Sequence, residues 1–136
     1  MAYVADETDE IHVRNIDGDL FPLSVFSTDP HQKFVEVSAE STAVNPHATW
    51  VRYFQCGYKA ILLNQASSFE KPRGMRIMID STVPIAAGLS SSSAFTVCAA
   101  ITTMHANGIV GLSPSKLAEQ CISAERLSGT ASGGMD

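Results

Sequence analysis

Long apolar runs, a secretory leader and glycosylation acceptors are all missing from this 136-residue sequence. No stretch predicts a membrane-spanning helix or a signal peptide, and Asn-X-Ser/Thr does not occur. Basic residues are also scarce, since 9 Lys and Arg face 14 Asp and Glu, for a net charge of -5. These absences predict a cytoplasmic location, and they argue against nucleic acid or an anionic membrane surface as the partner.

Cysteine and histidine are too few and too scattered to predict a disulfide framework or a metal cluster. Cys56, Cys98 and Cys121 are odd in number and lie far apart within helical apolar patterns, which favours reduced, buried thiols. The 4 histidines occur singly, without the spacing of zinc ligands. We therefore expect no metal cluster built from these side chains.

What remains is the composition of one globular domain with a substantial core. Hydrophobic residues make up 45% of the chain and charged residues 17%, and the length suits one domain better than two. The first forty residues predict β structure, namely an alternating strand at 10–15, a turn at Asp17-Gly18, a return strand at 20–26 and a third strand at 33–37. We expect these strands to form one wall of a mixed sheet.

Helical periodicity begins after Asn45-Pro46. From Thr49 to Asn64, apolar and aromatic residues recur at helical spacing, which predicts an amphipathic helix. Its aromatic stripe is typical of a core face and not of a ligand site. A polar connection follows, and residues 75–80 then alternate as a further strand.

The most informative stretch runs from Ile79 to Ala94 and predicts a strand, a glycine turn and a helix start. Gly88 permits backbone conformations that other residues avoid, and serines at 90–93 follow it. A helix start can hold a phosphate through its unpaired N–H donors and positive dipole end, without a lysine. The serine hydroxyls could add hydrogen bonds or bind magnesium. The alternative is a flexible serine-rich loop with a simple N-cap, but the strand before it and the apolar helix after it disfavour that interpretation.

Two further helices are predicted downstream. The first follows the serines, consists mostly of small residues that would let it lie close against a sheet, and ends near Asn107-Gly108. The second opens at Ser113-Pro114, with serine as N-cap and proline in the first turn, and runs to Leu127.

Glu125 occupies an unexpected place on this last helix. At about 100° per residue it falls between Cys121 and Ile122 and close to Ala118, on the apolar stripe. A carboxylate buried there needs a basic residue or a cation, because burying it alone costs several kcal/mol. The alternatives are that it reaches the edge of the stripe, or that it pairs with Arg126 or another basic residue.

Three segments together resemble a known family. They are Pro84-Ile-Ala-Ala-Gly-Leu-Ser-Ser-Ser-Ser-Ala94, the position of Glu125, and Gly129-Thr-Ala-Ser-Gly-Gly-Met-Asp136, in which adjacent glycines precede an acidic residue. They resemble the galactokinase branch of the GHMP small-molecule kinases, to which the helix around Trp50 is also similar. The serine run is particularly similar to that of N-acetylgalactosamine kinases.

The resemblance implies a fold and a reaction. The implied fold is α+β, the GHMP kinase N-terminal domain (ribosomal protein S5 domain 2-like), with a mixed sheet and helices packed on one face. Residues 1–136 would form a partial version of that domain. The implied reaction transfers the γ-phosphoryl group of ATP to O1 of galactose or a related hexose, with Mg2+ as cofactor.

The resemblance also implies roles for individual residues. Ser92 and Glu125 would bind magnesium, Gly133 would touch the sugar, and Asp136 would meet the anomeric hydroxyl as the catalytic base. The nucleotide phosphates would lie against the loop formed by Ala86, Ala87, Gly88, Leu89, Ser90, Ser91 and Ser92.

Some family features have no counterpart in this sequence. They are the first, sugar-gripping motif Arg-x-Asn-Leu-x-Gly-Glu-His-x-Asp-Tyr, the third glycine-rich motif and the C-terminal domain. We therefore expect a partial kinase that is inactive by itself. The alternatives are an N-acetylgalactosamine kinase, a non-catalytic sugar sensor that binds ATP and sugar, and a truncated product without function. The full length of the serine loop favours the enzyme over the sensor.

Overall fold

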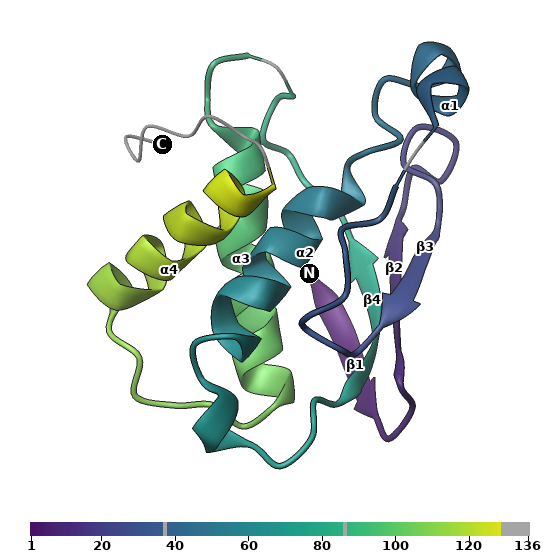
Figure 1. Cartoon of the computed structure of the whole chain (residues 1–136). Helices are drawn as coiled ribbons and strands as arrows, with labels where there is room; N and C mark the ends of the chain where they lie inside the picture. Colours follow the sequence, from purple (N-terminus) through teal and green to yellow (C-terminus); the bar gives the residue numbers. More distant parts are fainter. Residues whose placement is uncertain (37, 86, 129–136) are drawn as a thin grey trace.

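The computed structural model describes residues 1–36, 38–85 and 87–128, and within them a mixed sheet carries a layer of helices on one face (Figure 1). The strands are β1 Ala2–Asp6, β2 Glu10–Asn15, β3 Ser24–Ser27 and β4 Gly74–Ile79. Their order is β1-β4-β2-β3, with β2 and β4 parallel and the outer pairs antiparallel. The helices are α1 Ala39–Val44, α2 Val51–Leu62, the short 3-10 turn η1 Ala66–Ser68, α3 Ser91–Ala106 and α4 Pro114–Leu127. No helix in this described part is long and apolar enough to cross a membrane.

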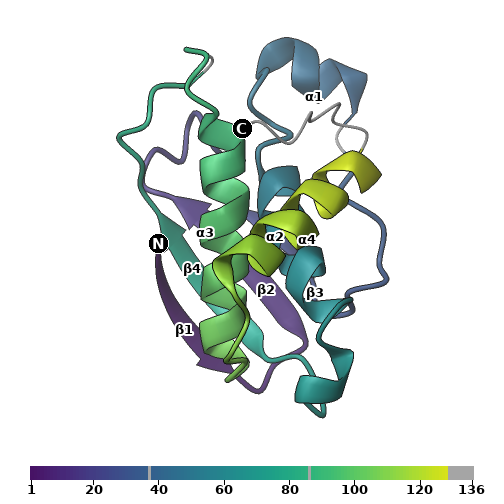
Figure 2. The same cartoon turned by 90° about the vertical axis from the view of Figure 1, so that its left-hand side faces the viewer.

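Helix α2 lies at the centre of the fold. The alternation of β2 and β4 turns Ile11, Val13, Met75 and Ile77 inward, where all four are buried. Helix α2 packs over them, and the aromatic stripe predicted from its sequence is part of this core. Helices α3 and α4 then cover α2, so that α2 is buried almost all round (Figures 1 and 2).

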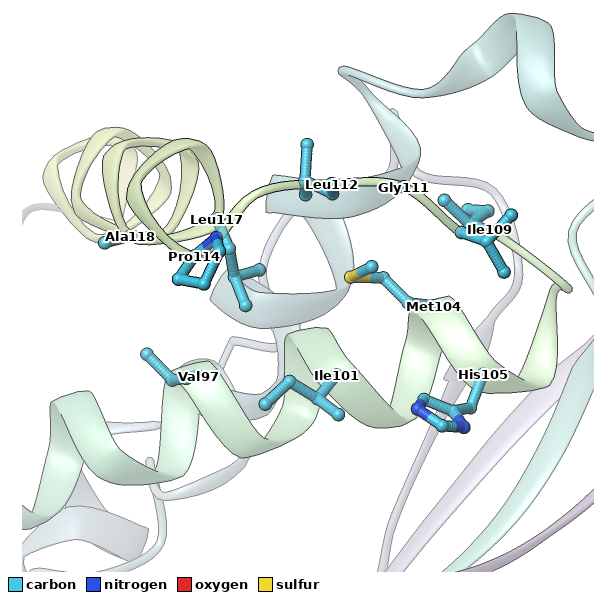
Figure 3. A pocket seen from close by; sticks show the side chains of 11 residues that line it. Val97, Ile101, Met104, His105, Ile109, Gly111, Leu112, Pro114, Leu117 and Ala118 are labelled. Atoms are coloured by element: carbon cyan, nitrogen blue, oxygen red, sulfur yellow. The ribbon is translucent and has the colours of Figure 1, made fainter.

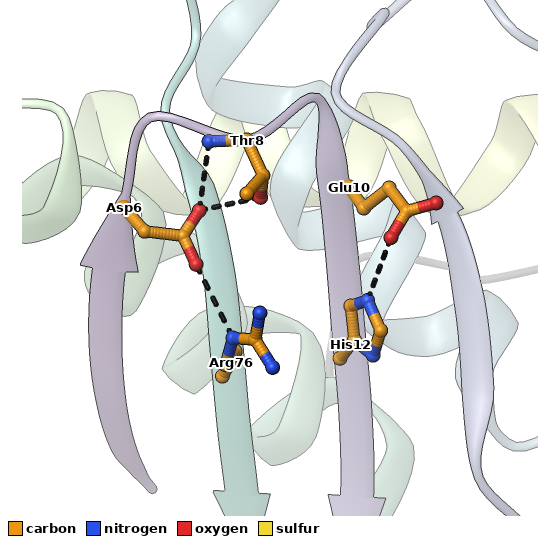
Figure 4. Close-up of polar contacts among 5 residues, drawn as sticks. All are labelled: Asp6, Thr8, Glu10, His12 and Arg76. Atoms are coloured by element: carbon orange, nitrogen blue, oxygen red, sulfur yellow. Dashed lines mark hydrogen bonds and ion pairs between the residues drawn. The ribbon is translucent and has the colours of Figure 1, made fainter.

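The opposite face of the sheet carries paired polar side chains. Arg76 on β4 contacts the Asp6 carboxylate at 3.3 Å, and His12 on β2 contacts Glu10 at 2.9 Å (Figure 4). Hydrogen bonds from the hydroxyl and backbone N–H of Thr8, with a smaller contribution from Arg76, hold the pKa of Asp6 below its usual value. Polar outward positions alternating with apolar inward ones are typical of a sheet with one solvated face.

The amino-terminal half corrects two sequence predictions and adds strand β1, which lies outside the predicted strands. The return strand is limited to Ser24–Ser27, since the backbone and side chain of Asp17 accept hydrogen bonds that fold residues 17–21 into a turn. No strand forms at 33–36, while Val37 lies outside the described residues. There the backbone of Val35 bonds to side chains of α2 instead of a strand, donating to Gln55 and accepting from Arg52.

The small residues of α3 bring it close to α2. A Cβ atom placed on Gly57 would lie 2.2 Å from the carbonyl oxygen of Thr96 and 2.8 Å from the Cβ of Ala99. Only glycine fits this crossing. Helix α3 contacts the sheet at β1, as expected, and it also approaches α2 closely, which places the start of α3 relative to the core.

Candidate functional site

The start of α3 is an open helix terminus at one end of the helical layer. Ser90, the residue before the helix, has the left-handed dihedral angles φ 52° and ψ 43°, and its side chain makes no cap hydrogen bond. Gly88, two residues earlier, also has a positive φ of 70°. Because the Ser90 side chain does not cap the helix, the backbone N–H groups of the first turn and the positive dipole end form a place where an anion can bind.

The predicted loop residues surround this terminus. Ala87, Gly88 and Leu89 are exposed, and Ser90, Ser91 and Ser92 are half-buried at the first turn of α3. Three other predicted residues, Ala86, Gly133 and Asp136, lie outside the described residues.

Glu125 reaches the same helix start from α4. Its side chain is only 4% exposed, so the alternative in which it lies at the edge of the apolar stripe is wrong. The Ser93 hydroxyl lies 3.5 Å from Oε2 of Glu125, and the Oε1 atom is buried without a hydrogen-bond partner among the described residues. An unsatisfied carboxylate oxygen beside an anion-binding helix start fits a bound cation.

The two cysteine thiols near Glu125 do not offer a charged ligand for such a cation. Burial, together with the nearby Glu125 charge, raises the pKa of Cys121 to about 11, and burial raises that of Cys56 to about 11 as well. Both thiols are therefore neutral near pH 7. No group of three or more His, Cys, Asp or Glu residues suited to a metal occurs in the described part of the chain. A cation here would be held by one carboxylate, neighbouring hydroxyls and ligand oxygens, as is usual for Mg2+ with phosphates.

Aromatic packing supports the start of α3 from below. The Phe95 ring stacks on the Trp50 ring with centroids 5.8 Å apart and an interplanar angle of 11°. The hydroxyl of Thr96 donates to the backbone oxygen of Tyr53 at 3.3 Å. The sequence predicted the aromatic stripe as core, but not that it meets the residues directly after the serines.

An apolar groove between α3 and α4 lies elsewhere (Figure 3). It has a volume of about 520 Å³ and includes Val97, Ile101 and Leu117 in its lining. None of the predicted site residues lines it. Its apolar lining does not suit a phosphate, which leaves the start of α3 as the candidate site.

Comparison with known proteins places these features in a family. The model of the GHMP kinases N terminal domain matches residues 52–136. The chain is similar to a galactokinase of Candida parapsilosis, with 33% identity over 99% of this chain but only 25% of that protein. It thus spans about a quarter of that relative.

Solved structures are similar in fold. The galactokinase of Lactococcus lactis, solved in complex with galactose, superimposes with a TM-score of 0.71 at 18% identity over 98% of this chain and 31% of the other. The mevalonate kinase of Methanococcus jannaschii gives 0.68 at 20% identity over 98% of this chain and 38% of the other. These likenesses confirm the predicted α+β fold, with its mixed sheet and one helical layer.

Proposed function

The chain belongs to the GHMP kinase family, as its motifs predicted, and from this premise we propose that it is the nucleotide-binding part of a galactokinase-type sugar kinase. One observation carries the proposal. The uncapped start of α3 and the buried, unsatisfied Glu125 carboxylate meet at one place. An anion and a cation are both accommodated there, and a magnesium nucleotide contains both.

The proposed reaction transfers the γ-phosphoryl group of ATP to O1 of galactose. The N–H groups at the start of α3 and the loop from Ala86 to Ser92 would bind the phosphates of ATP. Ser92 and Glu125 would hold Mg2+, which when bound neutralises charge on those phosphates. Phosphoryl transfer depends mainly on positioning and charge neutralisation, so a rigid helix terminus is well suited to it.

The sugar side of the proposal rests on the family resemblance. Gly133 would contact the sugar, and Asp136 would accept the proton of the anomeric hydroxyl. N-acetylgalactosamine is the alternative substrate, because the serine run is similar to that of kinases for this sugar.

The nucleotide site is tested by calorimetric titration of the chain with ATP, with and without Mg2+. We expect Mg2+ to raise the affinity for ATP. In Glu125→Gln this Mg2+-dependent increase in affinity should be about tenfold smaller, since the isosteric amide keeps the shape but loses the charge. Glu119→Gln is the control, because Glu119 is an exposed carboxylate on the same helix that pairs with Lys116. Equal Mg2+ dependence in both variants would remove Glu125 from the proposal, and absence of ATP binding would refute the proposed function.

Turnover is tested with a longer protein that contains this chain together with a sugar-gripping motif and a second domain. We expect phosphorylation of galactose or N-acetylgalactosamine, lost in Asp136→Asn while ATP binding persists. Binding of both ligands without transfer would instead identify a sugar sensor.

A further inference from the structure

Trp50 lies between the start of α3 and the loop that joins β2 to β3. On one side its ring stacks on Phe95, the fifth residue of α3. On the other side the edge of Phe21 meets it at a centroid distance of 5.6 Å and 62°, and Trp50 Nε1 donates to the backbone oxygen of Pro22 at 3.1 Å. Trp50 is only 6% exposed, so its ring is fixed from both sides.

This packing matters because the first turn of α3 lacks the usual means of fixing a helix end. Helix termini fray when they lack a side-chain cap, and the side chain of Ser90 makes no cap hydrogen bond. An anion bound by these donors requires that they point in a common direction before it arrives, since ordering them on binding lowers the affinity. The stacked rings, with the Thr96 to Tyr53 hydrogen bond, supply the rigidity that a cap would otherwise give.

We propose that Trp50 is a positioning residue for phosphate binding at the start of α3, acting through Phe95 and not through contact with the ligand. The inference rests on the proposed nucleotide-binding function and adds to it a residue outside the serine loop. It predicts that removing the Trp50 ring weakens the binding of a ligand that consists only of phosphates, without base or sugar.

The test uses calorimetric titration of the chain with inorganic tripolyphosphate and with ATP, each with Mg2+. Trp50→Leu removes the stack, and we expect both ligands to lose affinity by about five- to tenfold and to the same extent. Trp50→Phe keeps a stacking ring and loses the indole donor to Pro22, so its affinities are expected within about twofold of those of the parent chain. All titrations are made well below the melting temperature, with the folded fraction measured.

A matched control separates positioning from simple destabilisation. Phe26→Leu truncates a buried aromatic residue of β3 that packs on Phe54 and Tyr58. It lowers the melting temperature and keeps both rings of the Trp50–Phe95 stack, to which Phe26 is linked indirectly through Phe54. We expect unchanged affinity for tripolyphosphate in this variant. In a double-mutant cycle, Trp50→Leu and Phe95→Leu together should weaken binding no more than either alone, because both remove the same stack.

Three results would overturn the inference. The first is unchanged tripolyphosphate binding in Trp50→Leu. The second is a loss for ATP only, which would mean that Trp50 touches the base directly. The third is an equal loss in Phe26→Leu, which would mean that the effect is general destabilisation. If the parent chain binds neither ligand, the proposed function fails together with the inference, whereas any of the other three leaves that function standing.

Discussion

Helices α3 and α4 both begin after a serine, yet only the serine before α4 caps its helix with its side chain. Ser113, before α4, has extended dihedral angles of φ -70° and ψ 152°, and its hydroxyl accepts the N–H of Lys116 at 3.3 Å. Ser90, before α3, has a left-handed conformation in which its side chain makes no cap. The residue type is the same, so the backbone conformation decides whether the serine side chain caps the N–H donors of the first turn.

The two helices also differ in the faces they turn inward. Helix α3 approaches α2 through small residues at the Gly57 crossing. Helix α4 instead buries Cys121 and the Glu125 carboxylate. Helix α3 contributes the backbone N–H donors of its first turn, and α4 contributes the Glu125 carboxylate beside them.

The largest expected effect comes from breaking the rigid contact under α3. Gly57→Ala places a methyl group within 2.2 Å of the Thr96 carbonyl oxygen, and backbone atoms cannot move aside cheaply. We expect the free energy of unfolding, measured by urea denaturation, to fall by about 3 kcal/mol. Gly18→Ala is the control, since nothing lies within 4 Å of a Cβ atom there. A Gly57→Ala variant as stable as the Gly18→Ala variant would show that the two helices are not held at this crossing.

How far the sequence predicts this molecule depends on which interactions are local. Alternation identified β2 and β4, and the caps and glycine signals bounded α3 and α4, because these patterns act within a few residues. The burial of Glu125 was also predictable from helical spacing. The predicted strand at 33–37 does not form at 33–36, and this error has a long-range origin, because the backbone of Val35 bonds to Gln55 and Arg52, about twenty residues away.

The same distinction between local and long-range interactions applies to the candidate site. The glycine and serine run gave the open helix start directly, because glycine and serine have known conformational preferences. The stack of Phe95 on Trp50 and the contact of Ser93 with Glu125 join helices that are distant in sequence. A periodic pattern says which face of a helix is buried but not which helix it meets. The supporting contacts of the site therefore required the tertiary structure.

A second, smaller effect concerns the buried face of α4 and depends on pH. Burial raises the folded-state pKa of Cys121 from 9.0 to about 11, so the thiol stabilises the fold below pH 9. This contribution disappears as the pH rises from about 9 to about 11, since the unfolded thiol ionises first. Between pH 8 and 10.5 the free energy of unfolding, measured by urea denaturation, should therefore fall less in Cys121→Ala than in the parent chain. We expect the difference to be up to about 2 kcal/mol. The exposed Ser123→Ala variant should keep the parent slope, and identical slopes in both variants would contradict the assignment.

The smallest effect tests the comparison of the two serines itself, because the substitution of each serine should have a different cost in stability. Ser113→Ala removes a cap and is expected to cost about 1 kcal/mol of unfolding free energy. Ser90→Gly relieves a left-handed backbone, where L-residues pay about 1 kcal/mol, and is therefore expected to cost less than Ser113→Ala. Thermal and urea denaturation of the two variants in one buffer suffice. Destabilisation by Ser90→Gly equal to that of Ser113→Ala would mean that Ser90 is also a structural cap, and the start of α3 would lose its distinction as the open one.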